Sequence, residues 1–333
     1  MDFDDPTADP PIKVSRLTRF GVTTRDPARL ADFYRQAFGC RVLNQQRRSG
    51  SAFETLMGVK GGADSTVLML GDEIIELLAF DEAGMPYPPE STSNDPIFQH
   101  FAIVVDSMPE AYVRLSAIKG WTPISNGGPQ QLPQTSGGVI AFKFRDPDGH
   151  PLELLQFPNR ANPSHWPAGA AQGPFLGIDH SAITVRDTNA SLTFYADLGF
   201  APASRSLNKG PEQQRLDGLG GPVVDVLALT APHPTPHLEL LGYRNVALGS
   251  GRQVSANDVA ASRLTLECAD KVMGPSRTIM RTDPDGHHLI IEVREVDGHG
   301  VVFGVDGAAV VSAGIFEALE NTSCGGGVHG ARA

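Results

Sequence analysis

The feature that most constrains the fold is an internal repeat. Residues 17–39 and 178–199 both open with a segment typical of a strand, continue with Thr-Thr-Arg-Asp or Thr-Val-Arg-Asp, and end with Phe-Tyr and, a few residues later, Gly. The number of residues from the Arg-Asp pair to the Phe-Tyr pair is the same in both. Such a repeat predicts that the chain is built from copies of one unit, each with an opening strand followed by a helix.

A second motif, Asp-Pro-Asp-Gly-His, occurs at residues 146–150 and 283–287, each time between apolar runs. It predicts a turn, because Pro presets φ, Gly accepts positive φ and Asp bonds back to the backbone. Apolar segments at 98–106 and 261–270 divide each copy again. We therefore expect four modules of order strand-helix-strand-strand-strand, at about residues 14–80, 97–158, 175–243 and 260–294.

The composition suggests where the domains begin and end. Residues 159–174 are rich in Pro, Ala and Gly and are expected to be a linker. Residues 1–13 should be a disordered arm, and 295–333 an extension whose last part is disordered. This leaves a first domain at 14–158 and a second at 175–294, whose fourth module is shortened. A length of 333 residues fits two domains.

Charge and cysteine content exclude several classes of function. The chain has 27 basic and 38 acidic residues, so a nucleic-acid partner is not expected. No apolar run reaches ~18 residues, so we expect no membrane span. Cys40, Cys268 and Cys324 are few and far apart, which suits a reducing cytoplasm. Motifs typical of a Ser-His-Asp triad, a phosphate-binding loop or a dinucleotide site are lacking.

Together these motifs resemble the vicinal oxygen chelate superfamily, which includes glyoxalase I, bleomycin-resistance proteins, methylmalonyl-CoA epimerase and extradiol dioxygenases. The resemblance lies in the opening strand with His before Val-Arg-Asp, the Phe-Tyr helix, and the Asp-Pro-Asp-Gly-His turn before an apolar strand with Glu. It covers about residues 14–294. It implies an α+β fold in which βαβββ modules pair into two half-open mixed-sheet barrels, with a divalent metal in each competent cup.

The resemblance also implies the metal ligands, because each module of this superfamily offers one residue from its first strand and one from its last. Module two offers His100 and Glu153, and module three offers His180 and Glu239. The corresponding residues of modules one and four are Arg19, Glu76, Arg263 and Glu292.

Module pairing decides whether these residues can bind a metal. If neighbours pair, each cup contains an Arg, which cannot act as a ligand. If module two pairs with three, one cup gathers two His and two Glu, which suit one divalent ion: Ni, Co, Zn, Mn or Fe. The other cup then holds two Arg facing two Glu, a dead site held by ion pairs. The ligand chemistry favours this exchanged pairing.

The leading hypothesis is a metal-dependent lyase or isomerase of the glyoxalase type, acting on a small oxygenated substrate. The metal would chelate two adjacent oxygens and stabilise an enediolate, while Glu153 or Glu239 moves the proton. His100 and His180 would fix the ion. His237, on the same strand face as Glu239, is a candidate to support a ligand or carry a proton. Residues 210–219 could be a lid near the cup or a plain hairpin.

Two alternatives remain open. Two His and one carboxylate would also suit an Fe(II) ring-cleaving dioxygenase, although the common extradiol pattern places all three in the second copy, where Arg263 interrupts it. The second alternative is a non-catalytic protein that binds a drug or other small molecule in an apolar cup, with Trp121 and Trp166 as candidate lining residues. The partner is in each case a small molecule, and the sequence is compatible with a monomer or a homodimer.

Overall fold

The computed structural model describes residues 12–158, 173–249, 252–268 and 276–293. The expected linker and C-terminal extension lie outside the described residues, except at the linker's last two positions. So do most of the N-terminal arm, the segment of module four after its first strand, Trp166 and Cys324.

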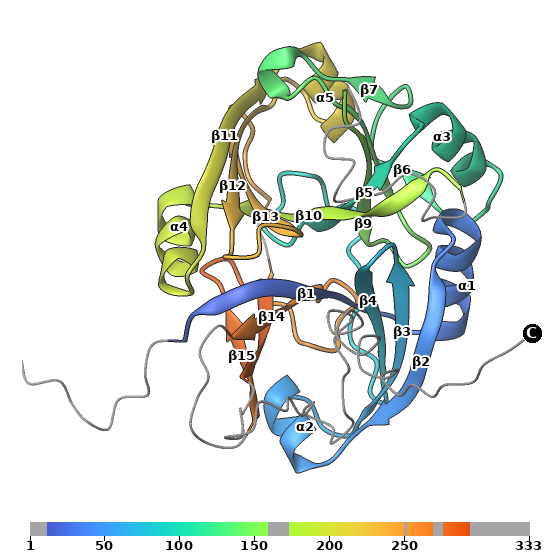
Figure 1. Ribbon diagram of the computed structural model, residues 1–333, viewed down its shortest axis with the longest axis vertical. Coiled ribbons are helices and arrows are strands. Elements are labelled where there is room, and N and C mark those ends of the chain that lie inside the picture. The colour runs from blue at the N-terminus through green and yellow to red at the C-terminus, as the bar shows by residue number, and fades with distance from the viewer. Residues whose placement is uncertain (1–11, 159–172, 250–251, 269–275, 294–333) are drawn as a thin grey trace, which may run out of the picture.

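Two mixed β-sheets form the framework, and they lie one above the other in Figure 1. The order in the seven-stranded sheet is β15-β16-β14-β1-β4-β3-β2. Its strands are β1 (Val14–Thr23), β2 (Arg41–Arg48), β3 (Ala63–Leu70), β4 (Glu73–Phe80), β14 (Arg263–Cys268), β15 (Arg277–Thr282) and β16 (His288–Val293). This sheet combines modules one and four.

The nine-stranded sheet combines modules two and three in the order β11-β12-β13-β10-β5-β9-β8-β6, with β7 paired to β8. Its strands are β5 (Gln99–Val105), β6 (Thr122–Pro123), β7 (Gln130–Gln131), β8 (Ile140–Arg145), β9 (Pro151–Gln156), β10 (Phe175–Val185), β11 (Ala201–Lys209), β12 (Val223–Thr230) and β13 (His237–Arg244). Antiparallel pairing of β5 with β10, and of β1 with β14, joins the two halves of the chain. The structure therefore has the exchanged pairing that the ligand chemistry favoured.

The helices flank the strands and partly differ from the expected pattern. They are α1 (Pro27–Phe38), α2 (Ser51–Met57), α3 (Met108–Ser116), the 3₁₀ helix η1 (Gln134–Ser136), α4 (Thr188–Asp197) and α5 (Pro211–Asp217). Modules one and three each contain a second helix, α2 and α5, while module two has the short β6, β7 and η1 in that region. The expected order of one helix and four strands was therefore too simple for these modules.

The repeated Arg-Asp motif begins the long helices. The Asp26 carboxylate accepts a hydrogen bond from the backbone N–H of Arg29, and the Asp187 carboxylate does the same for Asn189 and Ala190. Side-chain capping of this kind satisfies N–H groups that have no partner in the first helical turn. The motif therefore fixes where α1 and α4 start after the opening strands.

The Phe-Tyr motif and the Asp-Pro-Asp-Gly-His turn bond to each other between successive modules. The hydroxyl of Tyr34 in module one donates to Asp146 of module two at 3.1 Å, and Tyr195 donates to Asp283 in the same way. All four side chains are buried. Modules one and two belong to different sheets, as do modules three and four, so these hydrogen bonds connect the two sheets. The main core of Leu, Ile, Val and Phe side chains lies between the sheets.

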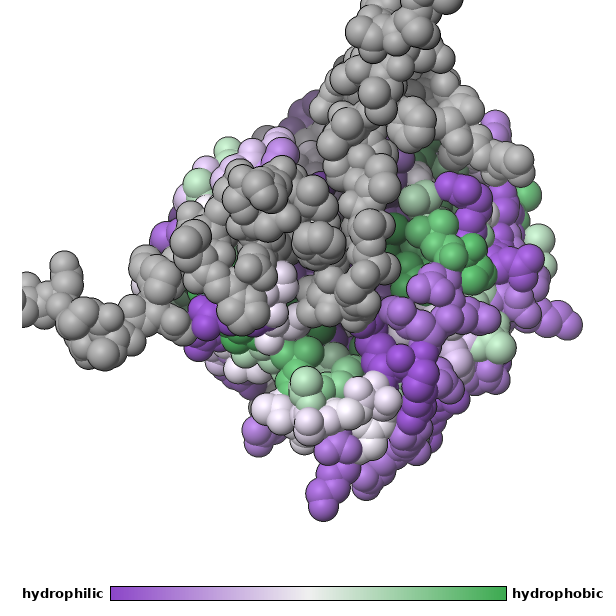
Figure 2. Space-filling model, turned by 60° about the horizontal axis from the view of Figure 1, so that its bottom comes forward, coloured by the Kyte–Doolittle hydropathy of each residue, from purple (hydrophilic) through white to green (hydrophobic). Residues whose placement is uncertain are grey.

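Viewed from the side of α2, the surface shows apolar areas among hydrophilic ones (Figure 2). None of the described helices is long and apolar enough to cross a membrane.

Candidate metal centre

A cavity of about 460 Å³ opens on the face of the nine-stranded sheet that points away from the main core, and all four predicted ligands line it. Register explains why they share one face. Glu153 lies opposite Ala102 on β5, and Glu239 lies opposite Ala182 on β10. Each Glu therefore lies opposite the residue that follows the His of its own module by two positions. A shift of two along a strand keeps the same face, so His and Glu point to the same side of the sheet.

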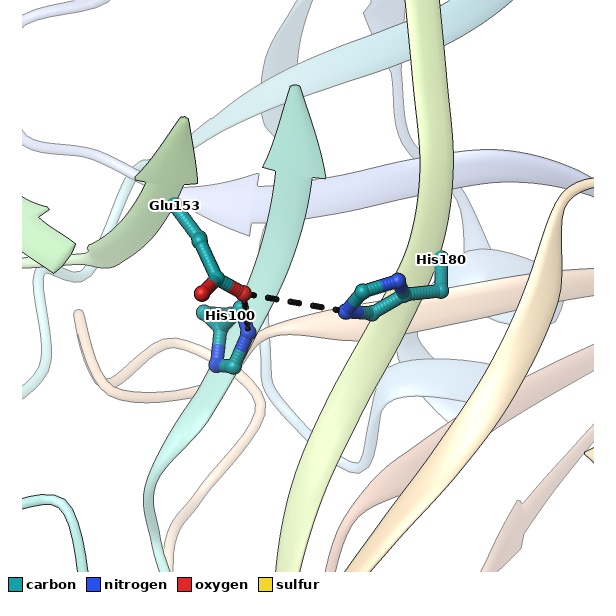
Figure 3. A group of neighbouring side chains, drawn as sticks. All are labelled: His100, Glu153 and His180. Carbon is teal, nitrogen blue, oxygen red and sulfur yellow. Dashed lines mark hydrogen bonds and ion pairs between the residues drawn. The ribbon is translucent and has the colours of Figure 1, made fainter. Parts of the chain in front are cut away.

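The side chains of His100, Glu153 and His180 point toward one another from the neighbouring strands β5, β9 and β10 (Figure 3). Oε2 of Glu153 lies 3.0 Å from Nε2 of His100 and 3.8 Å from Nε2 of His180. Oε2 of Glu239 lies 3.5 Å from the same His180 nitrogen. His100, Glu153 and His180 form a compact group whose ligand atoms all lie within 4.8 Å of one another, and Glu239 joins it from the side of His180.

The geometry of these atoms fits a divalent ion. Ligands that bind a metal at about 2.0–2.2 Å are themselves separated by roughly 3.0–3.5 Å in tetrahedral or octahedral sites. The observed separations of 3.0, 3.5 and 3.8 Å are close to this range. Nε2 of His180 is buried and has no hydrogen-bond partner among the described residues, which is costly unless a ligand satisfies it. The residues present therefore fit a metal.

Opposite charges dominate the electrostatics of the cluster. Burial would lower the pKa of His180, but the carboxylates of Glu239, Asp179 and Glu153 outweigh burial and raise it to about 9. Burial would raise the pKa of Glu239, but His180 and His237 outweigh it and lower the pKa to about 2. In the metal-free protein both ring nitrogens of His180 are thus protonated at neutral pH, and a divalent ion would displace the proton on Nε2.

Asp179 contacts His180 and was missed by the sequence analysis. Its Oδ2 lies 2.8 Å from Nδ1 of His180, so that ring nitrogen donates and Nε2 is left to face the cavity. Adjacent residues of a strand normally point to opposite faces. Here the pairing of β10 with β5 shifts between Ile178 and His180, and this β-bulge allows Asp179 to reach its neighbour. The only signal in the sequence is the Asp-His pair itself.

His237 lies where the sequence analysis expected it, beside Glu239 on β13. Its Nε2 is 3.7 Å from Oε1 of Glu239, and its Nδ1 is 3.8 Å from Oδ2 of Asp179. His237 therefore borders both a predicted ligand and the carboxylate that orients His180.

Lys143 also faces the cavity and was missed. It lies opposite Glu153 in the β8–β9 pairing, and its ammonium is 2.7 Å from Oδ1 of Asp217, with both side chains buried. Burial would lower the pKa of Lys143, but Asp217 outweighs burial and raises it. These partners are 74 positions apart and belong to different modules, so no local pattern could pair them.

Asp217 ends α5, the helix formed by the segment that was expected to be a lid or a hairpin. The segment joins the antiparallel strands β11 and β12, as a hairpin would, but it contains a helix in place of a plain turn. Two other residues of α5, Gln213 and Leu216, line the cavity, and Gln213 donates to Asp217 at 2.7 Å. The helix is thus anchored over one side of the cup by the buried pair of Lys143 and Asp217.

The seven-stranded sheet contains the second cup, where Arg19 forms the expected ion pairs. Its guanidinium lies 3.1 Å from Glu76 and 3.6 Å from Glu292. Arg48 and Ser65, which were not predicted, also bond to Glu76, at 3.1 and 2.6 Å. In this network the carboxylates of Glu76 and Glu292 form ion pairs with arginine side chains.

Arg263 shares one face of the sheet with Glu76, since both lie opposite Gly21 on β1, but its hydrogen bonds go elsewhere. It is fully buried, donates to Thr23 Oγ1 at 2.8 Å and to the carbonyl of Ala256, and stacks over Phe80. The register of the last strand is the same as in module two, but the glutamate lies two residues further along that strand. Glu292 lies opposite Glu267, and Ile290 occupies the position that corresponds to Glu153 in module two. Glu292 keeps its strand face, as expected, but is displaced along the strand.

Comparison with known proteins decides the family. A family model described as "Glyoxalase/Bleomycin resistance protein/Dioxygenase superfamily" matches residues 16–154 and 177–303. The chain belongs to this superfamily. Its two matched segments show a tandem arrangement of two copies within one glyoxalase-superfamily chain. No curated protein matches it.

Solved structures share the fold of this superfamily member at low sequence identity. Glyoxalase I from Zea mays is 16% identical, with a TM-score of 0.54, and the match covers 84% of this chain and 92% of that one. A putative dioxygenase from Bacillus subtilis is 14% identical, with a TM-score of 0.51, and the match covers 85% and 86% of the two chains. At these identities the likeness extends to the fold alone.

Proposed function

We propose that this chain is a metal-dependent lyase or isomerase of the glyoxalase type that acts on a small oxygenated substrate. The observation that carries the proposal is the buried Nε2 of His180. It has no hydrogen-bond partner in the described part of the chain and lies within 3.8 Å of the carboxylates of Glu153 and Glu239. Because β5 and β10 belong to the same chain, a single chain contains the whole site. His100, Glu153, His180 and Glu239 are the proposed ligands.

When bound, a divalent ion supplies Lewis acidity for negative charge on two adjacent substrate oxygens. The protein supplies the base. Glu153 is held by His100 at 3.0 Å and lies beside Lys143, so it is the more fixed carboxylate. The Glu239 side chain is 22% exposed, against 8% for Glu153, and borders His237. We therefore assign Glu239 as the base that takes the proton from the C–H bond between the oxygens.

Hydrogen–deuterium exchange tests this proposal. 2-Hydroxyacetophenone has two adjacent oxygens and a removable C–H, and its exchange in D₂O can be followed by NMR. The metal-loaded protein should accelerate exchange, and Glu239→Gln should abolish it while binding of benzohydroxamate, a chelator with two adjacent oxygens, persists. Equal loss of exchange and binding would argue against the base role. Glu153→Gln is the matched comparison and should weaken metal binding more strongly.

A second candidate is an Fe(II) dioxygenase, because the compact group contains two His and one Glu without Glu239. Oxygen uptake by anaerobically iron-loaded protein with catechol would support it, and no uptake would count against it. Failure of the wild-type protein to bind any divalent metal would oppose both enzymes and favour a non-catalytic binding protein. Trp121 gives that alternative no support, because it packs on Phe142 and Phe144.

A further inference from the structure

We propose that the cavity selects a substrate that is uncharged beyond its two metal-binding oxygens and has an apolar body, and that it rejects adducts bearing extra carboxylates. This inference rests on the proposed metal site and names its substrate class. A glutathione adduct, which carries two carboxylates and one ammonium group, belongs to the rejected class.

The cavity walls are mainly apolar around the proposed ligands. A volume of about 460 Å³ suits a small organic molecule. Apolar side chains come from both modules and from α5; they include Leu132, Val139, Leu155, Leu216, Val226 and Leu241. On β11, the neutral residues Ser206 and Asn208 line the cavity and lie opposite Val226 and Val224. Such walls favour an apolar body with few polar groups.

Two basic residues border the cavity, and each already has a carboxylate partner. Arg205 lies on β11 opposite Leu227, so its side chain is on the other face of the sheet from Ser206. Its guanidinium binds Asp225 there, at 2.7 and 2.5 Å. Lys143 does face the cavity, but Asp217 holds its ammonium at 2.7 Å. Among the described residues lining the cavity, none offers a cation without a carboxylate partner.

The charges around the site make an additional anion unfavourable. On the cavity side of the sheet, Glu153, Glu239, Asp179 and Asp217 contribute four negative charges, while Lys143 and a divalent ion would contribute three positive ones. Arg205, Arg244 and their shared partner Asp225 lie on the other face. With the three imidazoles neutral, the loaded cup thus keeps one net negative charge. A carboxylate on the substrate body would lose its hydration against apolar walls and find no cation to pair with, which is costly. A neutral body of the same size incurs no such penalty.

Three aromatic hydroxamates test the inference on zinc-loaded protein by calorimetry. Benzohydroxamic, 4-carbamoylbenzohydroxamic and 4-carboxybenzohydroxamic acids share the chelating head, and the last two differ in charge but hardly in size. We expect the carboxylate to bind roughly ten- to a hundredfold more weakly than the carbamoyl compound. Equal or tighter binding of the carboxylate would overturn the selectivity. If none of the three binds zinc-loaded protein, the metal site itself fails, and the inference fails with it.

A designed cation provides the converse test. Asp217→Asn would leave Lys143 available to a substrate carboxylate. If this variant does not fold, Val226→Lys provides a second test, because it adds a cation to the wall without removing an ion pair. Either variant should reduce the preference for carbamoyl over carboxylate at least about tenfold. Val226→Met, of similar length and neutral, is the matched control and should keep the wild-type ratio. An unchanged ratio in Val226→Lys would contradict the proposal.

Discussion

Oδ2 of Asp179 lies 2.8 Å from Nδ1 of His180, its immediate neighbour in the chain. The β-bulge that makes this contact possible leaves the two proposed histidine ligands unequal. His180 has one nitrogen fixed by a carboxylate, while Nδ1 of His100 is buried without a hydrogen-bond partner from the residues that the structure describes. A carboxylate behind a histidine fixes its tautomer and orientation and makes it a better ligand. His180 is therefore the better prepared of the two ligands.

Asp179→Asn should weaken zinc affinity about 10- to 100-fold, because the amide no longer holds the ring as a carboxylate does. Competition with a chromogenic chelator measures this directly, without any substrate. Gln99→Asn is the matched control. Gln99 precedes His100 as Asp179 precedes His180, but it donates to Ser181 instead of contacting the histidine, so its replacement should leave zinc affinity unchanged. Equal affinity of wild type and Asp179→Asn would refute the positioning role.

The raised pKa of His180 predicts how the stability of the metal-free protein depends on pH. Its folded pKa of about 9 exceeds the ordinary 6.5, so its stabilising contribution is fully present below pH 6.5 and is lost as the pH rises through 9. Other groups shift too, including Glu73, whose pKa burial raises to about 7. The informative quantity is therefore the difference in unfolding free energy between wild type and His180→Gln.

Urea unfolding with a chelator present, at intervals from pH 5 to 9, gives this difference. It should shrink as the pH rises from 6.5 to 9. A difference that stays constant or grows over this window would show that His180 is not held protonated by Glu239 and Asp179.

Lys143→Met should destabilise the protein by about 3–5 kcal/mol, because it leaves the Asp217 carboxylate buried without its cation. The double variant Lys143→Met/Asp217→Leu should recover much of this loss, since no charge then remains buried there. Chemical denaturation measures both. Arg35→Ala, which removes an exposed ion pair with Asp32, is the control and should have little effect. A single variant as stable as the double one would mean that Asp217 needs no partner.

Metal content should be one divalent ion per chain, not two. The second cup has Arg19 and Arg48 on Glu76, and an isoleucine where module two has Glu153. Mass spectrometry of reconstituted protein should find the ion lost in His100→Ala/His180→Ala and retained in Glu76→Gln. Two ions per chain, or loss in Glu76→Gln, would assign metal binding to the second cup as well.

The helix starts and the turns of the modules were predictable from the sequence, because they depend on local chemistry. Asp26 and Asp187 cap the helices, and the turns rely on Pro and Gly. The sequence also predicted which modules pair, because an arginine such as Arg19 cannot replace a histidine as a ligand. That inference needed only residue types and not distances.

What escaped prediction depends on register or on distant contacts. Asp179 reaches the site through a bulge, which alternation along a strand cannot foresee. Lys143 and Asp217 meet across two modules. Helix α5 has seven residues and no side-chain cap, so it is too short for a periodic pattern.

The exchange of modules between the sheets has a consequence for any split of the chain. Residues 12–158 supply β5 and residues 173–293 supply β10, so each half taken alone would expose an unpaired strand edge in both of its modules. Neither half contains both histidines of the cup. If the two halves were produced as separate polypeptides, metal binding would become a reporter of their association, and its strength would depend on their concentration.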